Sequence, residues 1–476
     1  KDERDMMPQF RFALISLAAI CAPVFAQDAV PLPEKVAKTV DQLIKDGLTD
    51  DTGYMFVERL TSQIGPRLAG SDAEQRARDW AVHELNGLAF SNVRVEPFEI
   101  PYWSRLTDTA EIVSPSHQKL RITALGGSTS TPEGGVTGEV VRFESMKALE
   151  AADPENVKGK IVFIDEKMTR TQDGSGYGMA VRKRRNCAKE TVAKGGLVCL
   201  IRSVGTQTRR FPHTGMMARG KAVGDGPAAA LSPPDADQLA RLLSYGDLDV
   251  KVKVNIQVET KEKAPSGNVI AEVVGREKPE EIILLGCHLD SWDLGTGAVD
   301  DGAGCGIVVG AAKLLLELEE QPKRTIRVVL YGPEEVGLLG GFAYLKAHKD
   351  NLDNHILAAE SDFGADKIWR FDTKFGDGAL AYAKTMQDIL APLGIAPGKN
   401  TASGGPDITM LARAGVPVVS PVQNGWDYFD LHHTPDDTLD KIDRDSLKQN
   451  IASYAAFAYL AAEMDWDFRK KPETEE

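Results

Sequence analysis

The sequence predicts an α/β fold with a largely parallel central sheet flanked by helices. Two observations in the C-terminal part carry this prediction. Short apolar runs alternate with longer helical patterns, as in βαβ units whose strands are parallel. Histidine and acidic residues follow these runs, and sites in open α/β sheets lie outside the carboxyl ends of the strands. We therefore expect these polar residues to meet at one edge of the sheet.

Hydrophobic periodicity places the individual elements. The N-terminal part contains three helical patterns and one alternating strand, at Val36–Gly47, Gly53–Ile64, Ala73–Leu88 and Asn92–Ile100. From residue 266 the predicted strands are Asn268–Val274, Ile282–Cys287, Thr325–Tyr331, Ile356–Glu360 and Val416–Ser420. The predicted helices are Gly304–Glu319, Gly337–Ala347, Gly378–Leu390, Asp407–Ala414 and the amphipathic Ser446–Met464.

The middle of the chain has a different texture. Between about 118 and 262, short strands alternate with glycine-rich turns, and a single helix is predicted at Asn186–Lys194. A chain of 476 residues is too long for one compact core. We therefore read 118–262 as a small, mostly β insertion that interrupts a main domain formed by 27–117 and 263–470.

Residues 6–26 predict a secretory signal peptide. They combine Arg11, a short apolar core and the small residue Ala26 before Gln27. We expect an exported protein without a membrane anchor, in the periplasm or the extracellular medium. The formal net charge of −14 argues against a nucleic-acid partner, which would need a basic face.

The cysteines fit an exported protein. Cys187 and Cys199 are close in sequence and could form a disulfide in an oxidising compartment. Cys287 and Cys305 lie in apolar surroundings, and we expect buried free thiols there. A metal-binding role for Cys287 is not expected, because its side chain would leave the strand on the face opposite to that of His288.

A mixed set of histidines and carboxylates predicts a metal centre. His288 and Asp290 share one face of a strand end, so Asp290 can fix the tautomer of a metal-bound His288. We expect one metal to be bound by three protein ligands, His288, Asp300 and Asp362. A second metal would share Asp300 and add Glu335 and His433. Glu334 is then free to act as the general base and later the general acid.

Two such metal ions, predicted as zinc, would support hydrolysis. Ions about 3.5–4 Å apart polarise a carbonyl group and lower the pKa of bound water to about 7. Each motif alone is a weak signal, because single histidines and paired carboxylates are common without a metal. The ordered combination at successive strand ends is much more specific.

These motifs resemble the co-catalytic di-zinc exopeptidases, a family of aminopeptidases and glutamate carboxypeptidase-type enzymes, and within it the carboxypeptidase Q branch. The matching segments are 288–293, 297–304, 334–337, 360–362, 404–407, 414–417 and 432–434, with 211–215 in the insertion. The resemblance implies zinc on the ligands named above, a bridging Asp300, and a protease-associated domain at 118–262. It also implies small peptide substrates and suggests a homodimer. The segments 421–430 and 434–438, on either side of the histidines, depart from the carboxypeptidase Q pattern, which leaves the substrate preference open.

Two further histidines enter through the resemblance. Many relatives place a tyrosine where this chain has His432, so His432 is a candidate hydrogen-bond donor to the oxyanion, or a residue that only orients its loop. His213 is a candidate for binding a substrate carboxylate from the insertion, or a surface loop histidine.

Two questions stay open at this point. Aminopeptidase, carboxypeptidase and dipeptidase activities share this metal chemistry, and they differ in whether the pocket offers an acidic or a basic group to the substrate terminus. The alternative outside catalysis is a binding or receptor-like protein that retains the fold. Loss of metal ligands would be the mark of such a protein, and this sequence keeps the full set.

Overall fold

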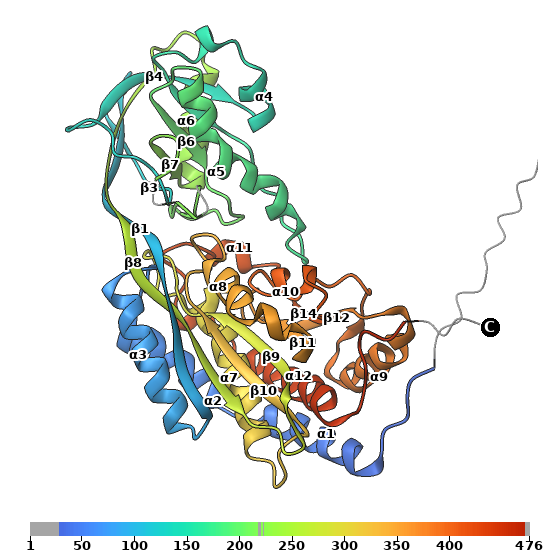
Figure 1. The fold of residues 1–476 in the computed structure, drawn as a ribbon. Helices are drawn as coiled ribbons and strands as arrows, with labels where there is room; N and C mark the ends of the chain where they lie inside the picture. Colours follow the sequence, from blue (N-terminus) through green and yellow to red (C-terminus); the bar gives the residue numbers. More distant parts are fainter. Residues whose placement is uncertain (1–27, 218–219, 222, 472–476) are drawn as a thin grey trace, which may run out of the picture.

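The computed structural model describes residues 28–217, 220–221 and 223–471, so the predicted signal peptide at 6–26 lies outside the described residues. The chain forms two lobes (Figure 1). The upper lobe comprises 122–244. The main lobe contains the rest, apart from a two-stranded ribbon that runs through both.

Four parallel strands form the centre of the main lobe, in the order β14, β11, β9, β10. Antiparallel strands flank this centre, with β12 beside β14 and β8 beside β10. The predicted fold class, a largely parallel sheet flanked by helices, is therefore confirmed. The strands are β9 Lys278–His288, β10 Arg324–Tyr331, β11 His355–Glu360, β12 Ile368–Lys374, β13 Ala396–Pro397 and β14 Val418–Gln423.

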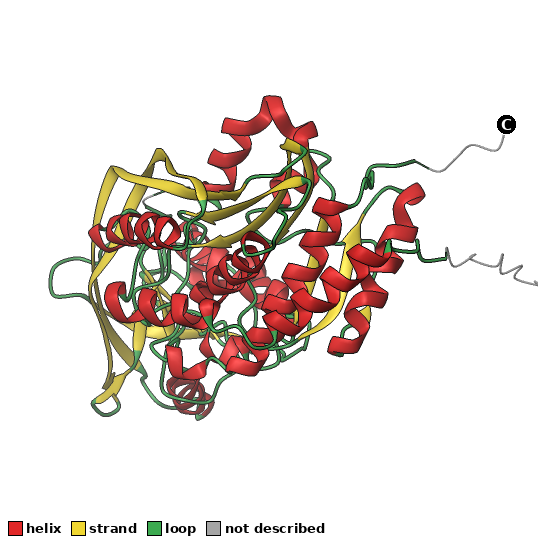
Figure 2. Cartoon of the chain, turned by 90° about the horizontal axis from the view of Figure 1, so that it is seen from below, coloured by secondary structure: helices red, strands yellow, loops and turns green. Residues whose placement is uncertain are grey.

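Side chains of the central strands alternate between two apolar layers. Ile283, Leu285 and Cys287 pack in the larger core, whereas Ile282 and Leu284 pack in a smaller one. Helices α1 Glu34–Gly47, α2 Thr52–Arg59, α7 Ala303–Leu316 and α12 Arg444–Glu463 build the larger layer. Helices α8 Leu339–His348 and α10 Thr409–Arg413 cover the other face. Figure 2 shows helices on both sides of the strands.

The last long helix differs from its prediction. We expected an amphipathic helix, but the residues of α12 from Ser446 to Ala462, apart from the partly exposed Lys448, are buried. The helix packs against α1 and α7, so it needs no solvated face. Its polar side chains bond to neighbouring backbone instead, as when Tyr454 Oη donates to Glu360 O at 2.7 Å.

Strands β1 Ser91–Ser114 and β8 Lys251–Val273 form a long antiparallel ribbon that links the lobes (Figure 1). The sequence indicated only separate pieces of it. Residues 259–263 of β8 are exposed, so this stretch has no buried face and shows no alternating pattern. Strand β12 was missed for a similar reason, because Arg370 and Asp372 interrupt its apolar residues.

The upper lobe is more helical than we expected. Its strands are β3 Ile122–Ala124, β4 Val136–Phe143, β5 Ile161–Ile164, β6 Val198–Arg202 and β7 Ala228–Leu231. The helices α4 Met146–Ala151, α5 Ser175–Ala193 and α6 Pro233–Ser244 accompany them. The start of α5 was missed because Gly176 and Gly178 weaken its helical pattern. The domain division at 118 and 262 stays a prediction, since position 262 falls within the β1–β8 ribbon.

The remaining elements connect these layers. Helices α3 Asp72–Gly87, α9 Leu380–Leu390 and α11 Tyr428–Leu431 lie in the main lobe, and β2 Gln118–Leu120 pairs with β1. Among residues 28–217, 220–221 and 223–471, no helix has the length and apolarity needed to cross a membrane.

The described residues contain two disulfides. Cys187 in α5 is bonded to Cys199 in β6, as the sequence allowed. Cys287 and Cys305 are also bonded, which corrects our expectation of free thiols. The sequence could not show this pairing, because it depends on how the loop after β9 folds back. The start of α7 lies beside the end of the strand, with the Cα atoms of Cys287 and Cys305 5.1 Å apart.

Candidate metal centre

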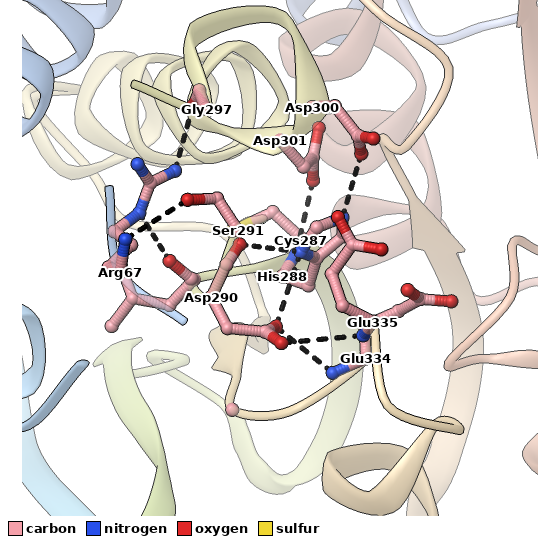
Figure 3. Close-up of polar contacts among 12 residues, drawn as sticks. Arg67, Cys287, His288, Asp290, Ser291, Gly297, Asp300, Asp301, Glu334 and Glu335 are labelled. Atoms are coloured by element: carbon pink, nitrogen blue, oxygen red, sulfur yellow. Dashed lines mark hydrogen bonds and ion pairs between the residues drawn. The ribbon is translucent and has the colours of Figure 1, made fainter. Parts of the chain in front are cut away.

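The predicted ligands come from four loops at one edge of the main sheet. His288 ends β9, while Glu335 and Asp362 follow the ends of β10 and β11. Asp300 lies in the loop between β9 and α7, and His433 follows the short helix α11. Figure 3 shows Asp300 above His288, with Glu334 and Glu335 approaching from the opposite side. Except for His288, these ligands line a cavity of ≈ 730 Å³.

The two oxygens of Asp300 point toward two histidines. His288 Nε2 lies 3.2 Å from Asp300 Oδ1 and 3.7 Å from Asp362 Oδ1. His433 Nε2 lies 3.3 Å from Asp300 Oδ2 and 2.9 Å from Glu335 Oε2. The five residues thus form two groups of three that share Asp300. These pairings match the two predicted ligand sets, although Glu335 also lies close to His288 and Asp300.

The donor set fits divalent cations. Asp300 Oδ2 and Glu335 Oε1 are buried and have no hydrogen-bond donor among the described residues. Burial, and then the neighbouring Asp300, raise the pKa of Glu335 well above its usual value. Such crowding of buried carboxylates is costly unless a cation neutralises them. Imidazole and carboxylate ligands in groups of three also suit zinc.

Asp301 is not part of this donor set, although it lies close to His288 and Asp362. Its two carboxylate oxygens accept hydrogen bonds from the backbone N–H groups of His288 and Gly304, both at 3.1 Å. Asp301 therefore fixes the end of β9 and the start of α7. Its neighbour Asp300 is left to face the cavity.

Asp290 orients the centre from below, as Figure 3 shows. Its carboxylate accepts from the backbone N–H groups of Glu334 at 3.0 Å and Glu335 at 3.3 Å. His288 Nδ1 donates to the backbone oxygen of Asp290 at 3.0 Å, with Asp290 Oδ1 at 3.4 Å. The backbone carbonyl thus shares with the carboxylate the role that we predicted for the carboxylate alone.

The carboxyl group of Glu334 faces the cavity beside the ligands. Burial raises its pKa well above the usual value, with a further contribution from Asp362, whereas His288 opposes the shift. A carboxylate in this position can exchange protons with a reacting group in the cavity.

Arg67 and Asp437 support the loop that carries Asp300, and the sequence analysis singled out neither. Arg67 is fully buried and donates to the backbone oxygens of Leu289, Thr296 and Gly297. Asp437 accepts from the N–H groups of Val299 at 2.6 Å and Asp300 at 3.3 Å. Arg67 lies more than 200 residues away in sequence, and no local pattern marks it.

The last ligand lies in a tight turn, 431–434, which we call the histidine turn. His433 adopts a left-handed backbone conformation with φ of 62°. The ring of His432 stacks on that of His433 at 3.5 Å, and His432 Nε2 lies 3.8 Å from Asp300 Oδ2. His432 therefore lines the cavity, and its buried Nδ1 has no partner among the described residues.

His213 is not placed where we expected a substrate-binding residue. Its ring is 1% exposed and does not line the cavity. Instead, its Nδ1 forms a 2.7 Å hydrogen bond with the backbone oxygen of His432. The ring is directed at the backbone of the histidine turn because the upper lobe packs on that turn, which the sequence could not show.

Another upper-lobe residue reaches the cavity. Arg184 in α5 is 5% exposed, and its guanidinium lies 5.5 Å from the centre of the Tyr177 ring. Its Nη2 donates to Tyr177 Oη and its Nη1 to Thr214 O, both uncharged acceptors, and its buried Nε has no acceptor among the described residues. Its positive charge is therefore open to an anionic group in the cavity.

Known proteins are similar to this chain in sequence and fold. Residues 268–458 match the family model of peptidase family M28. Carboxypeptidase Q from Bos taurus is 34% identical over 430 residues, which are 90% of this chain and 89% of that protein. The chain belongs to peptidase family M28. This M28 peptidase is thus a metallopeptidase.

Two solved structures have similar folds. The M28 peptidase precursor from Shewanella amazonensis superimposes with a TM-score of 0.89 at 46% identity, covering 92% of this chain and 99% of that one. A zinc aminopeptidase from Bacillus subtilis shares the fold, with a TM-score of 0.65 at 19% identity over 88% of this chain and 98% of that one.

Proposed function

We propose that this M28 peptidase is an exported exopeptidase with two zinc ions, which hydrolyses terminal bonds of small peptides. The observation that carries the proposal is the shared Asp300. Its two oxygens face different histidines, and each histidine faces a further carboxylate. One zinc would be held by His288, Asp300 and Asp362, and the other by Asp300, Glu335 and His433.

The chemistry divides between the ions and the chain. When bound, the ions would polarise the scissile carbonyl and stabilise negative charge on its oxygen. Glu334 removes a proton from the attacking water as the carbon–oxygen bond forms. It then gives this proton to the amine nitrogen as the carbon–nitrogen bond breaks. His432 is placed to donate a hydrogen bond to the carbonyl oxygen from the cavity wall.

Arg184 supports substrates that end in a free carboxylate. A buried guanidinium without an anionic partner is costly, and a substrate carboxylate in the cavity would supply the partner. This favours carboxypeptidase or dipeptidase activity over aminopeptidase activity on long chains. The name carboxypeptidase Q of the curated relatives points the same way.

Export is supported by two observations. The described residues contain two disulfides, which form and persist mainly in oxidising compartments. Residues 6–26 have the pattern of a signal peptide. Both fit the periplasm or the medium.

A peptide-library digestion read by mass spectrometry tests the proposal. We expect release of single terminal residues from short peptides, loss of activity with a chelator, and recovery with zinc. Glu334→Gln should lower kcat about 10²–10⁴-fold while the zinc content stays unchanged. Equal cleavage of C-terminally free and amidated peptides would contradict the role of Arg184. Cleavage that persists after complete zinc removal would contradict the metal mechanism.

A further inference from the structure

We propose that the upper lobe is part of the metal centre itself. The segment 211–215, acting through His213, fixes the histidine turn, so binding of the zinc ion on the His433 side depends on this lobe. The inference rests on the proposed two-zinc function. His213 is then a positioning residue that acts through the backbone and does not touch the substrate.

Three hydrogen bonds join the segment to the histidine turn. His213 Nδ1 bonds to His432 O at 2.7 Å, and Thr214 N donates to His433 O at 3.1 Å. In return, His433 Nδ1 lies 3.1 Å from Thr214 O. This last contact leaves Nε2 of His433 as the nitrogen available to a metal, because a ligating imidazole donates its other N–H to a neighbouring acceptor.

The histidine turn needs support from outside. His433 has a φ of 62°, which is unfavourable for a residue with a Cβ atom. The turn begins at the last residue of α11 and belongs to no strand, so no continuous ladder of backbone hydrogen bonds holds it. Such a conformation persists where the surroundings determine it, and here the surroundings include the upper lobe.

Two glycines make room for the histidine rings. A Cβ atom on Gly205 would lie 2.2 Å from His213 Cε1. A Cβ atom on Gly215, which has a φ of 134°, would lie 2.2 Å from Arg184 Nη1 and 2.8 Å from His433 Nδ1. All three distances are too short for a real Cβ atom, so the upper lobe approaches the rings as closely as a backbone can.

The contact extends along the chain that leads into the turn. Thr206 N donates to Phe429 O at 3.0 Å, and Thr206 Oγ1 donates to Asp430 Oδ1 at 2.7 Å. By contrast, His288 forms hydrogen bonds with residues of the main lobe, among them Asp290 and Asp301. The two zinc ions should therefore respond differently when the upper-lobe contact is weakened.

Metal binding by four variants tests the inference. His213→Phe keeps the volume of the ring and removes the donor, whereas His213→Asn places an amide N–H near the position of Nδ1. Gly205→Ala displaces the ring without changing it. The control is His355→Phe, because His355 is also buried and its Nδ1 lies 3.1 Å from a backbone oxygen, that of Asn351 in the main lobe.

Zinc per chain and both affinities are measured by elemental analysis and chelator competition, with folding checked by thermal unfolding. We expect His213→Phe and Gly205→Ala to lower one zinc affinity about 10–100-fold and to leave the other unchanged. His213→Asn should recover most of the loss, and His355→Phe should keep both affinities.

Two results would overturn the inference. One is a folded His213→Phe protein with both zinc affinities unchanged, and the other is an equal loss of both affinities that His355→Phe reproduces. A wild-type chain that binds one zinc ion would instead contradict the proposed function. The role of His213 would then be judged by the affinity for that single ion.

Discussion

The two histidines that face Asp300 are fixed in different ways. His288 ends a buried parallel strand, and its backbone and ring are held by Asp301 and Asp290, which are close in sequence. His433 lies in an irregular turn and is held by Thr214, 219 residues away in the other lobe. One half of the centre is therefore a product of the sheet, and the other half is a product of the contact between the lobes.

The two halves should therefore be sensitive to different substitutions. The strand-end half should fail when the supports of the β9–α7 loop are removed, since that loop carries Asp300. The histidine turn should fail when the lobes lose their contact, even if each lobe stays folded. Four changes away from the ligands test or limit this comparison.

The largest effect is expected for Arg67→Met. The substitution leaves the backbone oxygens of Leu289, Thr296 and Gly297 buried without a donor. A buried acceptor left without its donor costs about 1–3 kcal/mol, so the loss of all three hydrogen bonds should cost at least about 3 kcal/mol. The free energy of unfolding from denaturant titration should fall by about this amount, with loss of zinc. A fall below about 1 kcal/mol would show that the loop does not depend on Arg67.

Removing one disulfide at a time tests each lobe on its own, because one disulfide lies in each lobe. A closed loop of about 15 residues contributes about 3 kcal/mol in the chain-entropy description. Replacing Cys287 and Cys305 by alanine should cost this much and also weaken zinc binding, because their loop contains His288 and Asp300. Replacing Cys187 and Cys199 should lower stability in the upper lobe and leave the zinc affinity of the strand-end half unchanged. An equal effect of both double variants on that affinity would break the comparison.

Asp437→Asn tests the link between the two halves. Asp437 follows the histidine turn, yet it accepts from the N–H groups of Val299 and Asp300. An amide can accept only one of these bonds, so zinc affinity should fall about 10–100-fold. The control is Asp440→Asn, since the exposed Asp440 accepts from Thr438 and Lys441, which are close to it in sequence and lie in the same lobe. The same loss in both variants would exclude a specific role for Asp437.

The smallest effect concerns His355, which lies outside both halves. Burial lowers the pKa of His355 to about 4. The unfolded chain, with a pKa near 6.5, binds a proton more readily, so the stability present above that pH is lost as the pH falls toward 4. Because of this group, the free energy of unfolding should fall by about 1 kcal/mol between pH 6.5 and pH 5.5. In His355→Gln the free energy of unfolding should change less over this pH range than in the wild type. The same pH dependence in both proteins would contradict the prediction.

The sequence alone determined the position of the ligands that follow the strands. Apolar runs such as Ile282–Cys287 and Thr325–Tyr331 mark buried strands, and parallel strands present their carboxyl ends at one edge. The residues that follow them must therefore meet, as His288 and Glu335 do. The same argument placed Asp300 and Asp362, and the order of the motifs indicated the family.

Only the tertiary structure decided the rest. The pairing of Cys287 with Cys305, the burial of Arg67 and the position of His213 depend on segments that are far apart or fold back on each other. Hydrophobic periodicity reports how one segment meets its own core, and it carries no information about which distant backbone atom a side chain will reach. The contact between the lobes joins distant segments in this way, and it places His433, the last ligand of the site.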